Sequence, residues 1–317
     1  MKIHTNSKRI IISLTILTIL LLFILINFKG YAIDDAFNLL TFVLSILSCI
    51  ISCLLFAVKI DFNNKNANKY ISIISFMMSI LFSYIIVELL NQNVLFSLYI
   101  KRLIFNFILI IFLHLFIYAL SGKLNLSIIF SNLIIFILGV INYTVTCFRG
   151  TPFVPWDVLS IKTAVYIAGS YTFSFNHYIL LATSLFSLIV SIGLKVKYVP
   201  KKQWFNYTFR TVSLIVILVT TIVFYKTNII NYFDFENNLW KPRDEYLNNG
   251  FLASFLKQSK NLFNSAPQDY SLDNLNDIIS GKTISTFNPS YELDNNKPNI
   301  IVIMNESYCD LTVNRRL

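Results

Sequence analysis

Charged side chains are scarce in this sequence. Asp, Glu, Lys and Arg make up 13% of its 317 residues, whereas hydrophobic residues make up 56%, and the mean hydropathy is +0.64. Soluble globular proteins carry about 25% charged residues. The shortage of charge therefore argues against a soluble fold and predicts an integral membrane protein. The aromatic content of 15% suits lipid-facing helices and interfacial belts.

Cysteine is also too scarce and too scattered to build a metal or disulfide framework. The sequence has 4 Cys residues, and none of them shows a zinc-type spacing. Cys49 and Cys53 lie one helical turn apart inside an apolar run, which predicts small packing residues. Cys147 and Cys309 are isolated.

The net charge of +10 is concentrated in the first two thirds of the chain. Residues 1–225 hold 17 Lys or Arg and 5 Asp or Glu, whereas residues 226–317 hold 9 and 11. The basic residues lie in short segments between apolar runs, where they orient a membrane protein and meet anionic lipid. This distribution argues against nucleic acid as a partner.

Seven apolar segments predict an all-α bundle of about seven transmembrane helices in residues 1–225. A bilayer core of about 30 Å needs about 20 helical residues. With a cytoplasmic N-terminus, the inner segments hold 12 Lys or Arg and the outer loops hold 5. This asymmetry favours that orientation and places the residues after 225 outside the cell. The approximate expected spans are residues 10–28, an uncleaved anchor, then 37–58, 70–90, 103–120, 126–145, 178–194 and 212–225. The last of these is short, and a start nearer Tyr207 is the alternative.

Two ionisable residues lie inside the expected spans. Glu88 is near the outer end of the third span, where a carboxylate either marks a functional site or reaches the outer interface. His114 lies one turn from Tyr118, and we expect a packed, hydrogen-bonded histidine rather than a proton relay. We expect His4 and His177 at the surface.

The loop of residues 146–177 combines charge, proline and apolar residues. Two prolines three residues apart break any helix there, and Asp157 is placed to cap a following helix. The apolar residues after it offer a face for lying along the membrane. Two interpretations remain open. The loop is either a structural re-entry segment or a platform on which an outer domain docks, with Arg149 or Lys162 meeting lipid phosphate. Arg149, Asp157 and Lys162 are the candidate substrate or docking residues.

The remaining chain changes character twice. Residues 226–296 are polar and Asn-rich and predict a partly helical extracellular linker, with an amphipathic helix after Gly250. Residues 297–317 contain five consecutive apolar residues, 300–304, which predict a strand buried on both faces. In open α/β sheets, chemistry gathers beyond the carboxyl ends of such strands. Asn305, Glu306 and Ser307 occupy that position.

Motifs spread along the chain resemble a family. Their order is similar to that of the lipoteichoic acid synthases and related bacterial membrane phosphoglycerol transferases. The outer domain of these proteins belongs to the alkaline phosphatase and sulfatase superfamily. The motifs are Arg149-Gly150-Thr151-Pro152, Pro155-Trp156-Asp157, Asn249-Gly250-Phe251, Pro267, Tyr270-Ser271 and Lys297-Pro298-Asn299-Ile300-Ile301-Val302-Ile303-Met304-Asn305-Glu306-Ser307.

This resemblance implies a location in the bacterial cell membrane and a specific chemistry. Such enzymes transfer glycerol phosphate from phosphatidylglycerol to a cell-envelope polymer or glycan. A threonine attacks phosphorus, and a divalent metal, typically manganese, activates it. The glutamate at the end of the first strand is a metal ligand, and that role carries over to Glu306. A hard cation prefers such carboxylate oxygens.

The sequence also departs from the family after Glu306. Thr312 is only six residues further on, too near to match the family's nucleophile, and no histidine follows. Residues 297–317 are therefore expected to be the truncated start of an α/β sulfatase-like domain. The chain alone is expected to be inactive, because the nucleophile and most of the metal ligands are missing from it. Two alternatives stay open: a non-enzymatic transporter or sensor, and a regulatory partner of a full-length copy or of cell-envelope machinery.

Overall fold

The computed structural model of this chain describes residues 2–33, 36–61, 65–162, 175–196, 203–238 and 240–263. All of them belong to one compact unit, Met1–Asn264. The strand expected at residues 300–304 and the metal-ligand candidate Glu306 lie outside the described residues.

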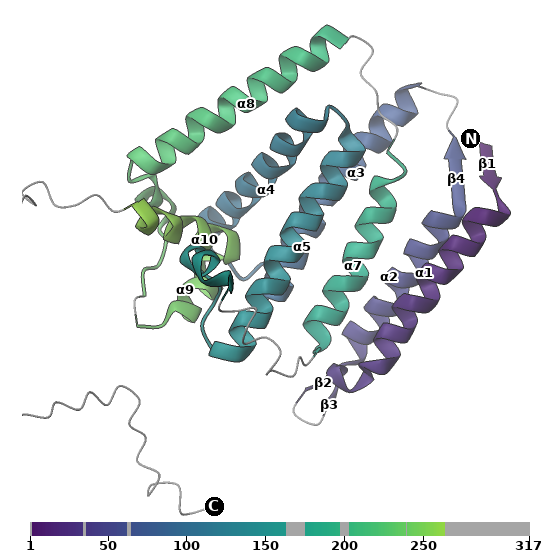
Figure 1. Ribbon diagram of the computed structural model, residues 1–317, viewed down its shortest axis with the longest axis horizontal. Coiled ribbons are helices and arrows are strands. Elements are labelled where there is room, and N and C mark those ends of the chain that lie inside the picture. Colours follow the sequence, from purple (N-terminus) through teal and green to yellow (C-terminus); the bar gives the residue numbers. More distant parts are fainter. Residues whose placement is uncertain are drawn as a thin grey trace, which may run out of the picture. The chain divides into compact units, whose positions relative to one another are not determined.

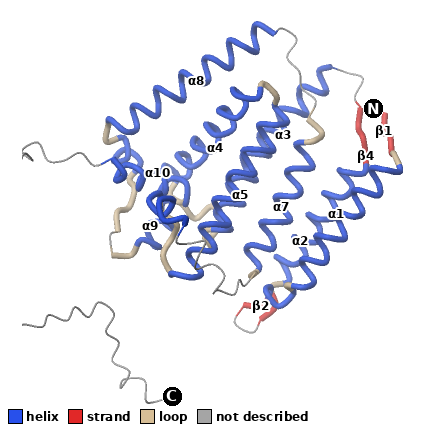
Figure 2. Tube along the Cα trace, in the orientation of Figure 1, coloured by secondary structure: helices blue, strands red, loops and turns tan. Residues whose placement is uncertain are grey.

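Apolar helices dominate this unit, as the sequence predicts (Figures 1 and 2). Two short antiparallel strand pairs, β1 with β4 and β2 with β3, lie at helix ends. The main helices are α1 (Ser7–Ile26), α2 (Leu39–Ala57), α3 (Lys65–Leu90), α4 (Ile100–Ser121), α5 (Leu124–Arg149), α7 (His177–Gly193) and α8 (Gln203–Lys226). The short elements among them are β1 (Lys2–Thr5), η1 (Phe28–Tyr31), β2 (Ala32–Ile33), β3 (Ala36–Phe37) and β4 (Val58–Asp61).

Six helices are long and apolar enough to cross a membrane: α1, α2, α3, α4, α5 and α8. They are compatible with a multi-pass membrane protein. The other expected span, 178–194, corresponds to α7, which is shorter at 17 residues and contacts α2, α3 and α5 (Figure 1). The approximate bounds of two expected spans differ from the helices. The last span, placed at 212–225 with an alternative start near Tyr207, lies in α8, whose apolar window is Tyr207–Lys226. The span expected at 126–145 lies in α5, which continues to Arg149.

Small side chains line the contacts between helices. Ser52 Oγ of α2 lies 2.9 Å from Ser187 Oγ of α7. A Cβ added to Gly139 of α5 would come within 2.6 Å of the Leu90 side chain of α3. Helices in lipid associate through such close approach, because apolar side chains gain little by leaving lipid tails. The buried residues of α2 are Ser45, Ser48, Cys49, Ser52 and Cys53, which confirms that both cysteines are packing residues.

Large apolar side chains instead face outward. Ile26, Leu40 and Leu218 are 80%, 69% and 60% exposed. Extensive apolar exposure on a soluble protein marks an interaction surface or an aggregation risk. On membrane-spanning helices the same surface faces lipid tails, so the exposure pattern agrees with the composition.

The polar segment after α8 folds back onto one end of the bundle (Figure 1). It contains η3 (Ile229–Phe233), α9 (Pro242–Asn249), α10 (Phe251–Ser259) and η4 (Lys260–Phe263). The amphipathic helix predicted after Gly250 is confirmed as α10. It contacts α3, α4 and η2 (Pro155–Ser160), and it belongs to the same compact unit as the apolar helices.

Candidate functional site

Buried polar side chains gather where α9 and α10 meet the bundle. We call this cluster the polar socket. Its members come from the end of α3, the loop after it, α4 and α5, and none is more than 9% exposed. They are Glu88, Asn91, Asn93, Asn106 and Asn142.

Glu88 holds the start of α10. Its Oε1 accepts a hydrogen bond of 3.0 Å from the backbone N–H of Phe251, the first residue of that helix. The first N–H groups of a helix have no partner within the helix and carry partial positive charge, so a carboxylate suits them. The Glu88 side chain is completely buried near the end of α3, where the polar segment packs against the bundle.

Asn91 and Asn93 connect Glu88 to α9. Asn93 Nδ2 donates to Glu88 Oε2 at 2.9 Å and to the Leu247 carbonyl at 2.8 Å. Asn91 Nδ2 donates to the Tyr246 carbonyl at 3.1 Å. The two amides thus donate hydrogen bonds both to carbonyls of α9 and to the second oxygen of the Glu88 carboxylate. Amide donors stabilise this buried carboxylate, and no cation contacts it among the residues that the structure describes.

Asn106 of α4 fits against the turn between α9 and α10. Its Nδ2 donates to the Asn249 carbonyl at 2.8 Å, and its Oδ1 accepts from the Ala253 N–H at 3.2 Å. Gly250 has φ +84°, and a Cβ there would come within 2.6 Å of Asn106 Nδ2. The Asn249-Gly250-Phe251 motif therefore has a physical basis, because only glycine allows both this backbone angle and this approach.

Asn142 of α5 brings the loop after α5 into the same cluster. Its Oδ1 accepts from the Phe153 N–H at 3.0 Å, and its Nδ2 donates to Asn91 Oδ1 at 3.1 Å. Phe153 stacks on Phe255 of α10 with ring centroids 5.4 Å apart, and its carbonyl accepts from the Tyr246 hydroxyl at 3.1 Å. The loop and the two short helices therefore form one packed surface.

Arg149 and Asp157, both predicted docking residues, bind each other. Arg149 Nη1 and Nη2 donate to the two Asp157 oxygens at 2.9 and 2.6 Å, and Nη2 also donates to the Pro152 carbonyl at 2.7 Å. Burial opposes ionisation of Asp157, but the hydrogen bonds from Arg149 and from the Val154 N–H outweigh it and lower the pKa of this carboxyl. The positive charge of Arg149 is therefore partly neutralised by Asp157 of the same loop.

Two further predictions for this loop have different outcomes. Asp157 lies in the first turn of η2 and reaches back to the Val154 N–H at 3.0 Å, so it does not occupy the cap position itself. Lys162 is exposed and forms no ion pair with another residue that the structure describes. It is not brought together with Arg149 and Asp157.

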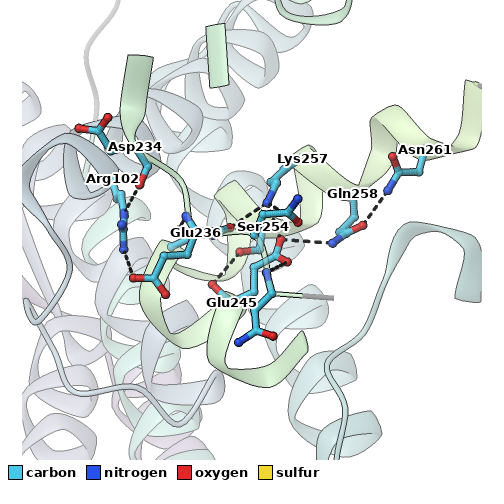
Figure 3. Close-up of polar contacts among 11 residues, drawn as sticks. Arg102, Asp234, Glu236, Glu245, Ser254, Lys257, Gln258 and Asn261 are labelled. Atoms are coloured by element: carbon cyan, nitrogen blue, oxygen red, sulfur yellow. Dashed lines mark hydrogen bonds and ion pairs between the residues drawn. The ribbon is translucent and has the colours of Figure 1, made fainter. Parts of the chain in front are cut away.

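The segment after η3 is fixed by paired charges (Figure 3). Arg102 Nη1 lies 3.1 Å from Glu236 Oε1, and its Nε donates to the Asp234 carbonyl at 2.9 Å. Glu245 is nearly fully buried and accepts from Lys257 Nζ at 3.1 Å and from Gln258 Nε2 at 3.2 Å. These carboxylates are engaged in structural contacts.

Within the described ranges, no group of three or more His, Cys, Asp or Glu side chains could hold a metal ion. Glu88 and Glu245 are occupied by amide and ammonium donors, so their chemistry does not fit a divalent cation. The donor expected for manganese, Glu306, lies outside the described residues.

A second polar network crosses the middle of α3, α4 and α5. His114 Nδ1 lies 2.9 Å from the Ile110 carbonyl, and its Nε2 lies 2.8 Å from Ser79 Oγ. Asn132 donates to Ser79 Oγ at 2.7 Å and accepts from Ser83 Oγ at 2.9 Å. The expected packed, hydrogen-bonded histidine is confirmed. His177 was expected at the surface, and that was wrong, because it is 7% exposed at the start of α7.

Comparison of the chain with known protein families, curated proteins and solved structures finds no match. The asparagines of the polar socket were not predicted. The available signal was their position: Asn91, Asn106 and Asn142 interrupt or end apolar runs. A buried amide in such a run needs partners, which implies a polar element packed against it.

Proposed function

We propose that this chain is the membrane-anchoring N-terminal part of a lipoteichoic acid synthase-like enzyme. Such an enzyme transfers glycerol phosphate from phosphatidylglycerol to a cell-envelope polymer or glycan through a metal-activated threonine. In this proposal the chain lies in a bacterial cell membrane, α7 is a seventh span, the N-terminus is cytoplasmic, and residues after 225 are extracellular. Glu306 is a ligand of the divalent metal.

One observation supports the proposal above the others. Three motifs of the resemblance, two from one loop and one from a distant part of the chain, lie on one surface. Arg149-Gly150-Thr151-Pro152 and Pro155-Trp156-Asp157 form the loop after α5, and Asn249-Gly250-Phe251 joins α9 to α10. The Tyr246–Phe153 hydrogen bond and the Phe153–Phe255 stack join them. Such a surface suits the attachment of an outer domain that follows in the chain.

The fixed geometry of this surface also agrees with an anchoring role. Glu88, Asn91 and Asn93 tie α9 and α10 to the membrane helices through three hydrogen bonds at 2.8–3.1 Å. Two more hydrogen bonds, at 2.9 and 3.4 Å, join these three side chains to one another. An enzyme that acts on a membrane lipid needs its catalytic residues at a defined height above the bilayer. A rigid connection provides that height more reliably than a flexible linker does.

The gene provides the first test. The proposal expects that DNA beyond codon 317, in the same or a neighbouring frame, encodes a threonine some tens of residues after Glu306 and later Asp and His residues. A stop codon followed by unrelated sequence in every frame contradicts the proposal and favours a non-enzymatic membrane protein.

Thiol labelling tests the orientation. In a variant without the native cysteines, Trp240→Cys, at a site 94% exposed, should react with a membrane-impermeant maleimide in intact cells. Lys123→Cys, in the turn between α4 and α5, is the matched control and should react only after permeabilisation. The reverse pattern contradicts the proposed orientation.

A further inference from the structure

A cavity of about 290 Å³ lies between α4 and α8. We call it the α4–α8 slot. Phe233 of η3 and Leu256 of α10 contribute to it at the end where the polar segment packs. Side chains from the two membrane-spanning helices form its walls: Phe105, Leu109 and Phe112 from α4, and Thr220, Thr221 and Phe224 from α8.

Contacts beyond the slot hold α8 in place at both ends. Near the start of α8, Arg210 Nε donates to the Ala119 carbonyl at 2.6 Å and Nη2 to the Leu120 carbonyl at 2.9 Å, which caps the end of α4. Near its other end, Lys260 Nζ donates to the Thr227 carbonyl at 2.8 Å. The slot therefore lies beside a helix, α8, that hydrogen bonds hold in place at both ends.

The position and the lining of the slot indicate its occupant. Both walls belong to spans, so the surrounding medium is lipid acyl chain. The Thr220 and Thr221 hydroxyls in the wall bond to carbonyls of their own helix, so the wall offers mainly apolar surface. Such a surface suits the methylene groups of an acyl chain, which pack at contact distances of about 4 Å.

A cation lies beside the slot. Lys260 Nζ is 4.6 Å from the centre of the Phe224 ring, which is part of the wall. An ammonium has three donors, and the Thr227 carbonyl takes one of them. No carboxylate pairs with Lys260 among the residues that the structure describes. Partial burial lowers the pKa of Lys260, so an anionic partner would stabilise its charged form.

We propose that the α4–α8 slot binds one acyl chain of an anionic phospholipid whose phosphate contacts Lys260. The apolar walls alone would accept any lipid tail, because a tail gains little by moving from the bilayer into an apolar slot. Selectivity therefore comes from the charge at the mouth. This site does not depend on the proposed enzymatic function or on the orientation of the chain.

Photolabelling of the full chain in lipid nanodiscs tests the site. The probe is phosphatidylglycerol with a diazirine on one acyl chain, present as a trace in phosphatidylcholine, and labelled peptides are mapped by mass spectrometry. More label should attach to the slot walls than to α1. The spans of α1 and α8 are each 11% buried, so α1 is as open to lipid as α8 and serves as the reference. Unlabelled phosphatidylglycerol should compete more strongly than phosphatidylcholine, a result that needs no variant.

Two pairs of variants separate the tail from the headgroup. Thr220→Trp should fill the slot and reduce its labelling at least fivefold, whereas Val219→Trp, at an exposed neighbouring position outside the slot, should not. Lys260→Gln should lower labelling by the anionic probe about fivefold, as expected for one basic residue at an anionic surface, while Lys260→Arg retains it.

Three outcomes would overturn the proposal. The first is equal labelling of α1 and the slot. The second is unchanged labelling in Thr220→Trp. The third is a phosphatidylglycerol to phosphatidylcholine labelling ratio that Lys260→Gln leaves unchanged.

Discussion

The Glu88 carboxylate accepts a 3.0 Å hydrogen bond from the backbone N–H of Phe251, 163 residues further along the chain. This contact joins the end of a membrane-spanning helix to the start of a short helix in the polar segment. Because both groups are buried, the removal of either leaves an unpaired partner, which costs more than the hydrogen bond itself contributes.

Replacement of Glu88 should loosen α9 and α10. Glu88→Leu leaves the Phe251 N–H and the Asn93 amide with a lost acceptor, and we expect the free energy of unfolding to fall by about 3 kcal/mol. Glu88→Gln retains one acceptor oxygen and should cost less. Unfolding by SDS in mixed micelles measures the difference. Val94→Ala, at a site 74% exposed, is the control and should be neutral. A neutral Glu88→Leu would contradict the structural role.

Two glycines at the ends of helices provide a matched pair. Gly150 has φ +72° and ψ −4°, where alanine strains the backbone by about 1–2 kcal/mol. Gly250 has φ +84° and ψ 153°, a region that residues with a side chain almost never adopt. Only at Gly250 does the new Cβ also meet another group, Asn106 Nδ2 at 2.6 Å, whereas nothing lies within 4 Å at Gly150. Gly250→Ala should therefore lower the unfolding midpoint clearly more than Gly150→Ala. Equal effects would contradict both the greater backbone strain and the Asn106 contact at Gly250.

The Arg149–Asp157 pair should make the loop after α5 sensitive to acid. The pKa of Asp157 is lowered from its ordinary 3.8 in the folded chain. Its stabilising contribution is therefore complete above that ordinary pKa and is lost as the pH falls through the lower folded value. Arg149 is 43% exposed, so solvent screening limits the contribution to about 1 kcal/mol.

Trp156 fluorescence reports this loop. In a variant in which Trp204 and Trp240 are phenylalanine, the emission should shift as the pH falls from 7 through the acidic range. Asp157→Asn should abolish the acid-dependent part of the shift, because the asparagine does not titrate. An identical acid transition in both proteins would place the titrating group elsewhere.

The network around His114 should be stabilising but modest. Asn132→Leu removes the partner of both Ser79 and Ser83, and hydrogen bonds between membrane helices contribute about 0.6–2 kcal/mol each. We therefore expect a loss of about 1–3 kcal/mol in the same SDS assay. Thr18→Val on α1, where the hydroxyl bonds only to its own helix, should cost less than about 0.5 kcal/mol. A neutral Asn132→Leu would show that the serines find other partners.

Local sequence determined the elements. In lipid, a long apolar run with few charges can form all its backbone hydrogen bonds only as a helix. The apolar runs within residues 7–149 and 203–226 therefore predict membrane spans without knowledge of the fold. The pattern after Gly250 likewise predicts α10, because its apolar residues recur with helical spacing. The roles of Cys49, Cys53 and His114 also followed from their neighbours along the chain.

Only the tertiary structure decided which polar groups meet. His177 and Glu88 could not be placed from sequence, because helical periodicity does not say whether a face meets lipid, water or another helix. The distant partners of Glu88, Asn91 and Asn106 lie 143–163 residues away. The slot beside Lys260 depends on Arg210, which ties α8 to the end of α4, and on Lys260, which ties η4 to the end of α8. A buried polar group requires a partner, but its own sequence neighbourhood does not specify which distant segment provides one.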